Sequence, residues 1–165
     1  MSYNLHPIFV HFPIAMLLVY SVIKILPLKK WFPKFAWRDI ERVLLMVGVI
    51  GAFAALATGD TAVHLVHPNR QLVEAHENFA DIATWLYGAL LLGEVAAFIN
   101  ERLSGRNKIF QFIERILCNR TFSFVLALLA LVAITLTGLL GGIIVYGKTA
   151  DPFAQIILNW LGINI

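Results

Sequence analysis

The sequence predicts an all-α, polytopic membrane protein, a four-transmembrane-helix bundle with short amphipathic helices at its interfaces. Hydrophobic residues make up 59% of the 165 positions and charged residues only 14%, and the mean hydropathy is +0.78. A soluble domain of this length has too little polar surface to cover so many apolar side chains. The apolar residues also fall into four stretches that are long enough to cross a hydrocarbon core, which takes about 20 residues per helix.

We expect these transmembrane helices at about 8–28, 43–63, 79–100 and 122–146. Backbone groups inside hydrocarbon have no water to bond, so each stretch must satisfy its own hydrogen bonds as a helix. The stretches lack the alternation of apolar and polar residues that is typical of a membrane β-barrel. Because no Ser/Gly linker or low-complexity tract interrupts the pattern, residues 1–165 are expected to form a single domain.

The distribution of basic residues predicts the orientation. Lysine and arginine crowd the first and third connections, whereas the second connection and the C-terminal segment have only Arg70 and Lys148. By the positive-inside rule, the crowded connections lie in the cytoplasm and both termini are extracytoplasmic. The net charge of +3 is thus a topology signal and gives no reason to invoke nucleic acid. We expect a multi-pass protein of the bacterial inner (plasma) membrane, in contact with the lipid bilayer.

Three segments outside the transmembrane stretches carry interfacial patterns. Residues 106–120 place apolar side chains at helical spacing between basic ends, which predicts an amphipathic helix in the cytoplasmic interface. Residues 29–38 mix aromatic and basic side chains, as is typical of a headgroup boundary. The tail 151–165 has an apolar face but is too short to cross, so we expect an interfacial helix or a cover over the outer end of the bundle.

All five histidines fall at the predicted outer end. His6 and His11 lie at the start of the first helix, His64 and His67 follow the second, and His76 opens the third. Four acidic residues are expected at the same level: Asp60, Glu74, Glu77 and Asp81. Ionisable residues at membrane depth are functional-site candidates by default, because burying them is expensive.

The first interpretation is a haem b site with a role in electron transfer, as in a membrane b-type cytochrome. Haem iron takes axial imidazoles, and cofactor sites in bundles are built from side chains on facing helices. His11 and His76 are the favoured axial pair, His6 and His64 are candidates for a second haem or a propionate, and Arg70 is placed to neutralise propionates. Quinol or an extracytoplasmic electron carrier would be the partner.

Two alternatives stay open. A non-haem metal site for Zn, Fe or Cu would use His11, His76, His64, His67 and Asp60, and an open position on the metal would make the protein a membrane metal-dependent hydrolase. The other alternative is a structural or partner-binding subunit without a cofactor. The sequence has no nucleophile elbow, phosphate loop or dinucleotide fingerprint, so whether the protein is an enzyme is left open.

Two further features of the sequence are small residues on the second and fourth helices and one acidic residue within the third. Gly48 and Gly51 on the second helix, and Gly138, Gly141 and Gly142 on the fourth, favour close helix packing. Such packing allows a homo-oligomer, and the sharper interpretation of these glycines is room for a flat ring beneath the histidines. For Glu94, within the third helix, a functional role and a side chain that reaches the cytoplasmic end are both open.

Four segments resemble one family: LHPIFVHFPIAMLL (Leu5–Leu18), ATGD (Ala57–Asp60), AHENF (Ala75–Phe79) and GLLGGIIVYG (Gly138–Gly147). They look like the bacterial membrane family called Domain of Unknown Function 2231, and the resemblance covers about Leu5 to Gly147. It implies a four-helix membrane domain with a histidine–proline opening and a Gly-Gly…Val-Tyr close. It implies no activity, so the function has to be argued from the chemistry of the side chains.

Overall fold

The computed structural model describes residues 6–66, 69–103, 107–149 and 151–163, with the side chains at 7 and 60–66 excepted. Its elements in chain order are α1 (His6–Ile25), α2 (Leu28–Trp31), α3 (Trp37–Val66), α4 (Arg70–Arg102), α5 (Lys108–Leu117), α6 (Arg120–Tyr146) and α7 (Ala154–Leu161). Every element within the described ranges is an α-helix, which confirms the predicted fold class.

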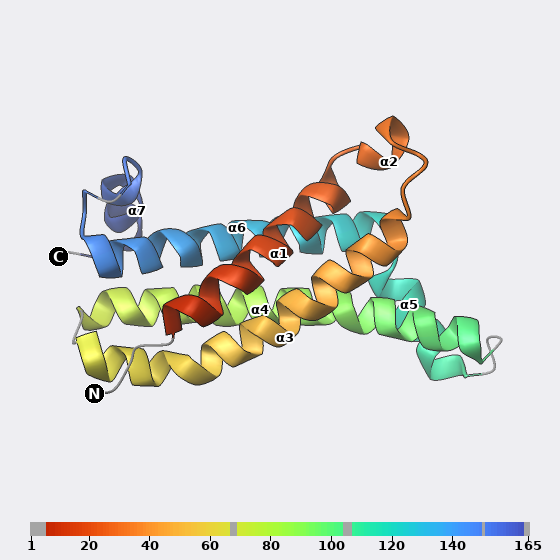
Figure 1. Cartoon of the computed structure of the whole chain (residues 1–165), viewed down its shortest axis with the longest axis horizontal. Coiled ribbons are helices and arrows are strands. Elements are labelled where there is room, and N and C mark those ends of the chain that lie inside the picture. The colour runs from red at the N-terminus through yellow and green to blue at the C-terminus, as the bar shows by residue number, and fades with distance from the viewer. Residues whose placement is uncertain (1–5, 67–68, 104–106, 150, 164–165) are drawn as a thin grey trace.

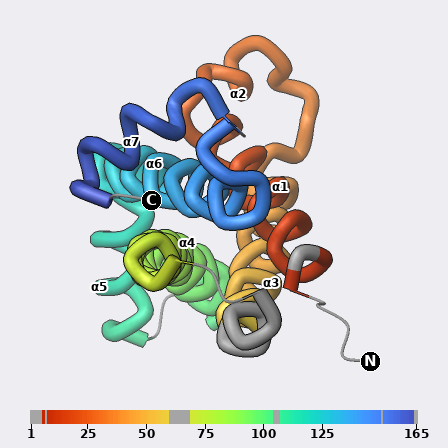
Figure 2. The backbone as a smooth tube through the Cα atoms, turned by 90° about the vertical axis from the view of Figure 1, so that its left-hand side faces the viewer, coloured from red at the N-terminus to blue at the C-terminus, as the bar shows by residue number. Residues whose placement is uncertain are grey.

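The four helices α1, α3, α4 and α6 are long and apolar enough to cross a membrane. They run along the long axis of the molecule (Figure 1), and seen end-on they form a ring in which α1 and α4 each border both α3 and α6 (Figure 2). Two helices start earlier than their apolar stretches: α3 begins at Trp37 and α4 at Arg70. Their first turns are polar, so a search for apolar stretches does not detect them.

Asparagine side chains fix where three helices begin. Asn69, Asn107 and Asn119 precede α4, α5 and α6, and the side-chain oxygen of each accepts hydrogen bonds from backbone N–H groups of the first turn. Those N–H groups have no partner within the helix, so an asparagine cap stabilises the start. Glycines follow the last residues of α6 and α7, with φ angles of 78° at Gly147 and 69° at Gly162, which a side chain would strain.

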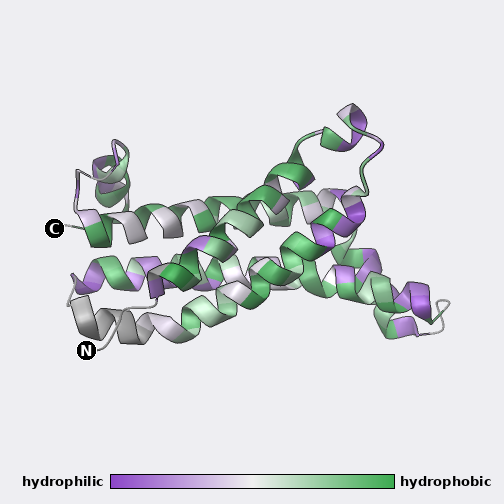
Figure 3. Ribbon diagram, in the orientation of Figure 1, coloured by the Kyte–Doolittle hydropathy of each residue, from purple (hydrophilic) through white to green (hydrophobic). Residues whose placement is uncertain are grey.

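The core lies along the middle of the bundle and consists of aliphatic, alanine and tyrosine side chains. Leu17 and Tyr20 of α1 pack there with Leu45 of α3 and Tyr87 of α4. Within this layer the hydroxyls of Ser21 and Tyr87 share a hydrogen bond of 2.7 Å. Large apolar side chains are also exposed along the four long helices, and Figure 3 shows hydrophobic residues along much of their length. Lipid would solvate that outer surface, so the structure fits a multi-pass integral membrane protein.

Glycines bring α1 against α3. A Cβ added at Gly48 would lie 2.6 Å from Cδ2 of Leu17, and one added at Gly51 would lie 3.0 Å from Cβ of Pro13. Close helix packing through small residues, the simpler interpretation of this stripe, is therefore confirmed for α3. The two contacts also fix the register in which α1 lies along α3.

The short helices lie at the ends of the bundle. Residues Ala154, Leu158 and Ile163 of the α7 region pack against Leu140 and Ile143 of α6, so the tail forms a helix that covers this end. At the opposite end, α5 packs on α4 and exposes an apolar face formed by Ile109, Phe112 and Ile116. The exposed aromatic residues Trp31, Phe32 and Phe35 follow the same pattern around α2. These positions fit the predicted interfacial segments.

The close contact of α5 with α4 yields a stability prediction. A Cβ at Gly93 would lie 2.7 Å from the Leu117 Cβ, so Gly93→Ala should push α5 away and lower the free energy of unfolding by about 1–3 kcal/mol. Gly88→Ala is the matched control on the same helix, because its Cβ meets nothing within 4 Å and alanine is the better helix former. Equilibrium unfolding in mixed micelles measures both. Equal stability of the two variants would contradict the packing.

Candidate functional site

His76 is held by α6. It lies in the second turn of α4, and its Nδ1 is 2.9 Å from the backbone oxygen of Thr137. A carbonyl oxygen only accepts hydrogen bonds, so the imidazole donates through Nδ1–H and its Nε2 has the lone pair when the ring is neutral. The ring also lies against Gly141, where an added Cβ would come within 3.2 Å of the His76 Cε1. The imidazole is therefore fixed in orientation by both a hydrogen bond and packing.

His6 is held in the same way by α3. Its Nδ1 is 3.0 Å from the hydroxyl oxygen of Thr58. That hydroxyl donates its hydrogen to the Ala55 carbonyl at 2.9 Å, so it accepts from the imidazole, and Nε2 again has the lone pair. Burial lowers the pKa of His6 below its ordinary value, and the hydrogen bond to the Ala55 backbone opposes this shift only in part.

The two anchored imidazoles lie at the same end of the bundle, near the first residues of α1 and α4. They come from α1 and α4, which occupy opposite corners of the ring in the end-on view (Figure 2). The structure thus anchors, at this end of the bundle, two histidines that are 70 positions apart in the chain, each with its lone pair on Nε2 when the ring is neutral.

The other predicted site residues are placed differently. The His11 side chain is exposed on α1, and Arg70 forms an exposed ion pair with Glu74, 2.9 Å apart. The side chains of Asp60 and His64, and all of His67, lie outside the described residues. The roles assigned to these residues from the sequence stay predictions.

The described part of the chain contains no residue cluster that supports the metal hypothesis. Within it, no group of three or more histidine, cysteine, aspartate or glutamate side chains is arranged to hold a metal ion. A set that includes His64, His67 and Asp60 would draw on side chains outside that part. The metal set therefore stays a prediction.

Sequence analysis missed the two residues that orient the imidazoles, Thr58 and Thr137. Thr137 lies four residues before Gly141, so the two share one face of α6. A threonine and a glycine four residues apart, on a helix expected to face His76, would have indicated this contact. Thr58 stands within the ATGD motif, but its partner is 52 residues away, and no local spacing indicates that pairing.

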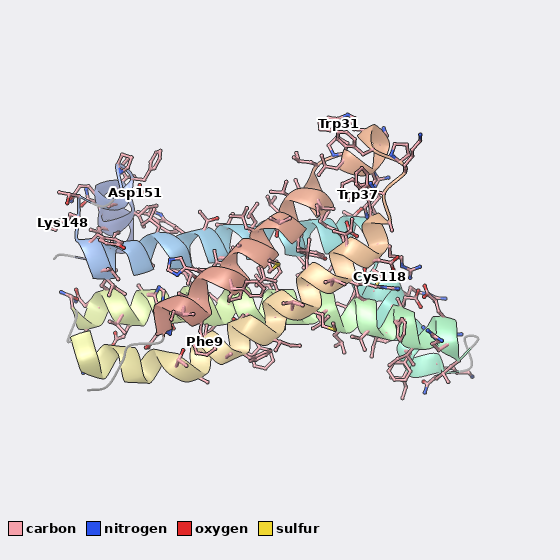
Figure 4. The ribbon with its side chains drawn as sticks, viewed as in Figure 1. Phe9, Trp31, Trp37, Cys118, Lys148 and Asp151 are labelled. Atoms are coloured by element: carbon pink, nitrogen blue, oxygen red, sulfur yellow. The ribbon has the colours of Figure 1, made fainter. Side chains whose placement is uncertain are left out.

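The opposite end of the bundle is built from ion pairs. Glu94, whose role was open, accepts a hydrogen bond from Nε of Arg42 at 3.2 Å, and the buried Glu41 pairs with Lys29 at 2.8 Å. Figure 4 places Trp31, Trp37 and Cys118 at this end and Lys148 and Asp151 at the other. Acidic side chains within the bundle are therefore paired with basic ones at one end, while two imidazoles are anchored to neutral oxygen atoms at the other.

Comparison with known proteins gives one match. A family model described as "Predicted membrane protein (DUF2231)" matches residues 2–150, which confirms the resemblance of the four sequence segments. No curated protein and no solved structure matches the chain.

The lowered pKa of His6 predicts a pH dependence of stability. Between the folded pKa and the ordinary value the unfolded chain binds more protons, so the contribution of His6 is present above about pH 6.5 and is lost as the pH falls. We expect the free energy of unfolding to fall more between pH 7.5 and 5.5 for the native chain than for His6→Gln. Equilibrium unfolding at both pH values measures this difference, and identical losses in the two proteins would refute it.

Proposed function

The chain belongs to the family described as "Predicted membrane protein (DUF2231)", and from that premise we propose that it is a membrane haem b protein with a role in electron transfer. The observation that carries the proposal is the pair His6 and His76, both with Nδ1–H donated to an oxygen of a neighbouring helix. An axial imidazole coordinates through one nitrogen, and its other N–H is fixed by a carbonyl, hydroxyl or carboxylate. The donor set therefore fits a haem with two histidine ligands.

We infer His6 and His76 as the axial pair, in place of the His11 and His76 pair that the sequence favoured. His6 is anchored on α3 and half-buried, whereas the side chain of His11 is exposed. His64 stays a candidate for a second haem or a propionate. Arg70 stays a candidate for neutralising propionates, for which it would have to leave Glu74.

The surface of α6 beside His76 favours a flat ligand. Gly138 and Gly142 lie close to Gly141 on α6, and a Cβ added at either would meet no atom of the described residues within 4 Å. Packing among the described residues therefore does not account for glycine at these two positions. An uncovered backbone beside His76 would leave room for a flat ring, which supports the sharper interpretation of these glycines.

The orientation suggests where the electrons go. If the basic connections lie in the cytoplasm, as the positive-inside rule predicts, the histidine end is extracytoplasmic. The haem would then exchange electrons with quinol or with an extracytoplasmic carrier. Its iron would supply the redox chemistry, and the chain would contribute the two ligands, their fixed orientation and the burial that tunes the potential.

Absorption spectra test the proposal. Protein purified from haem-supplied cells should show a Soret band, with α and β bands that sharpen on reduction, as expected for six-coordinate haem. His6→Ala and His76→Ala should each lose these bands, and His11→Ala, the matched control on α1, should keep them. Gel filtration confirms that each variant stays folded.

Each other result identifies a different site. If His11→Ala lost the haem bands and His6→Ala kept them, His11 and not His6 would be the ligand that pairs with His76. Colourless protein with stoichiometric Zn, Fe or Cu by elemental analysis would replace haem with a non-haem metal. Protein with neither cofactor would refute the haem proposal and favour a structural or partner-binding subunit.

A further inference from the structure

The end of the bundle opposite the histidines has a crevice between α3 and α4. Its volume is about 210 Å³, and it is lined by Arg42, Met46, Leu91, Glu94, Val95 and Phe98. Met46, Val95 and Phe98 are each more than 40% exposed. On a membrane-spanning bundle, apolar side chains exposed at this level face lipid.

The charges on the floor of the crevice are paired within the chain, but Nη2 of Arg42 is buried without a hydrogen-bond partner among the described residues. Arg42 and Glu94 form an ion pair of 3.2 Å and are mostly buried. Glu101 pairs with Arg38 and lies 3.6 Å from Nη2 of Arg42. Because the buried charges neutralise each other, the walls that remain accessible are those of an apolar channel.

The mouth of the crevice carries an excess of positive charge. The Arg102 guanidinium lies 5.2 Å from the centroid of the Phe98 ring, and that of Arg42 lies 5.7 Å from it. Within the described residues Arg102 forms no salt bridge, so three arginines share two glutamates and one positive charge is left without an acidic partner. An anion at the mouth would balance this charge.

The crevice has the length and the chemistry of an amphiphile. Leu91, Val95, Phe98 and Arg102 follow each other at steps of four, three and four residues, so they form one stripe of α4 that ends in a guanidinium. A Cβ at Gly88 would meet no atom of the described residues within 4 Å, which leaves the stripe open for about 15 Å from Phe98. Beyond Gly88, the rings of Phe53 and Trp85 meet at 6.0 Å and bridge the two helices.

We propose that this crevice binds one anionic phospholipid, with an acyl chain along Met46, Leu91 and Val95 and the phosphate paired with Arg102. Basic pockets between membrane helices bind anionic headgroups, and a guanidinium matches the geometry of a phosphate. The site is separate from the histidines and does not depend on the proposed haem.

Native mass spectrometry of the purified full chain tests the site. With phosphatidylglycerol and phosphatidylcholine of equal chain length added, the chain should retain one phosphatidylglycerol in preference to phosphatidylcholine. Arg102→Gln should weaken phosphatidylglycerol binding about fivefold, as expected for one basic residue at an anionic headgroup. Lys148→Gln removes the same charge at the opposite end of the bundle (Figure 4) and should leave binding unchanged.

A second variant tests the channel without changing charge. Val95→Trp fills the crevice and should abolish retention of both lipids, whereas Val132→Trp, at an exposed position on α6, should not. Equal retention of the two lipids by the native chain would overturn the proposal, as would normal binding by a folded Val95→Trp. A dimer that Val95→Trp dissociates would also overturn it, because the face would then be an interface between two copies of this chain.

Discussion

Hydrocarbon solvates neither backbone amides nor charged side chains, and the arrangement of this chain follows from that constraint. The backbone is satisfied within four long helices, and polar side chains are sorted to the two ends of the bundle. Between the ends, the core of leucine, alanine and tyrosine includes a hydroxyl pair of Ser21 and Tyr87. The two ends bury their polar side chains in different ways, and we infer the role of each end from that difference.

At one end, charge is retained and paired. Glu41 and Glu94 keep cationic partners on Lys29 and Arg42, so their burial stabilises contacts between helices. At the other end, the imidazoles of His6 and His76 meet neutral oxygen acceptors. A neutral acceptor adds no charge that would favour the protonated ring, and an imidazole anchored through Nδ1–H has its lone pair on Nε2 when it is neutral. The ion-pair end is therefore structural in character, and the imidazole end is the one at which we propose the cofactor.

The sequence was sufficient for the fold and for the level of the site, because apolar stretches and histidine positions are local properties. It was insufficient for the pairings. Glu94 meets Arg42 across 52 positions, and His6 meets Thr58 across the same separation. Such contacts depend on the register between helices, which no single helix encodes. The sequence placed His11 and His76 together because of their similar depth, which stays a prediction, and depth alone does not say which side of α1 faces α3.

That register is itself set by small residues. Leu17 lies over Gly48 and Pro13 over Gly51, and seven residues before Pro13 the chain reaches His6, while seven residues after Gly51 it reaches Thr58. Two helical turns on each antiparallel helix therefore carry the close contact directly to the histidine anchor. On α6, Gly141 has the same role, because it lies against the imidazole of His76 of α4. The glycines that allow the helices to approach are thus also the reason that the two imidazoles are held, so packing and site form one arrangement.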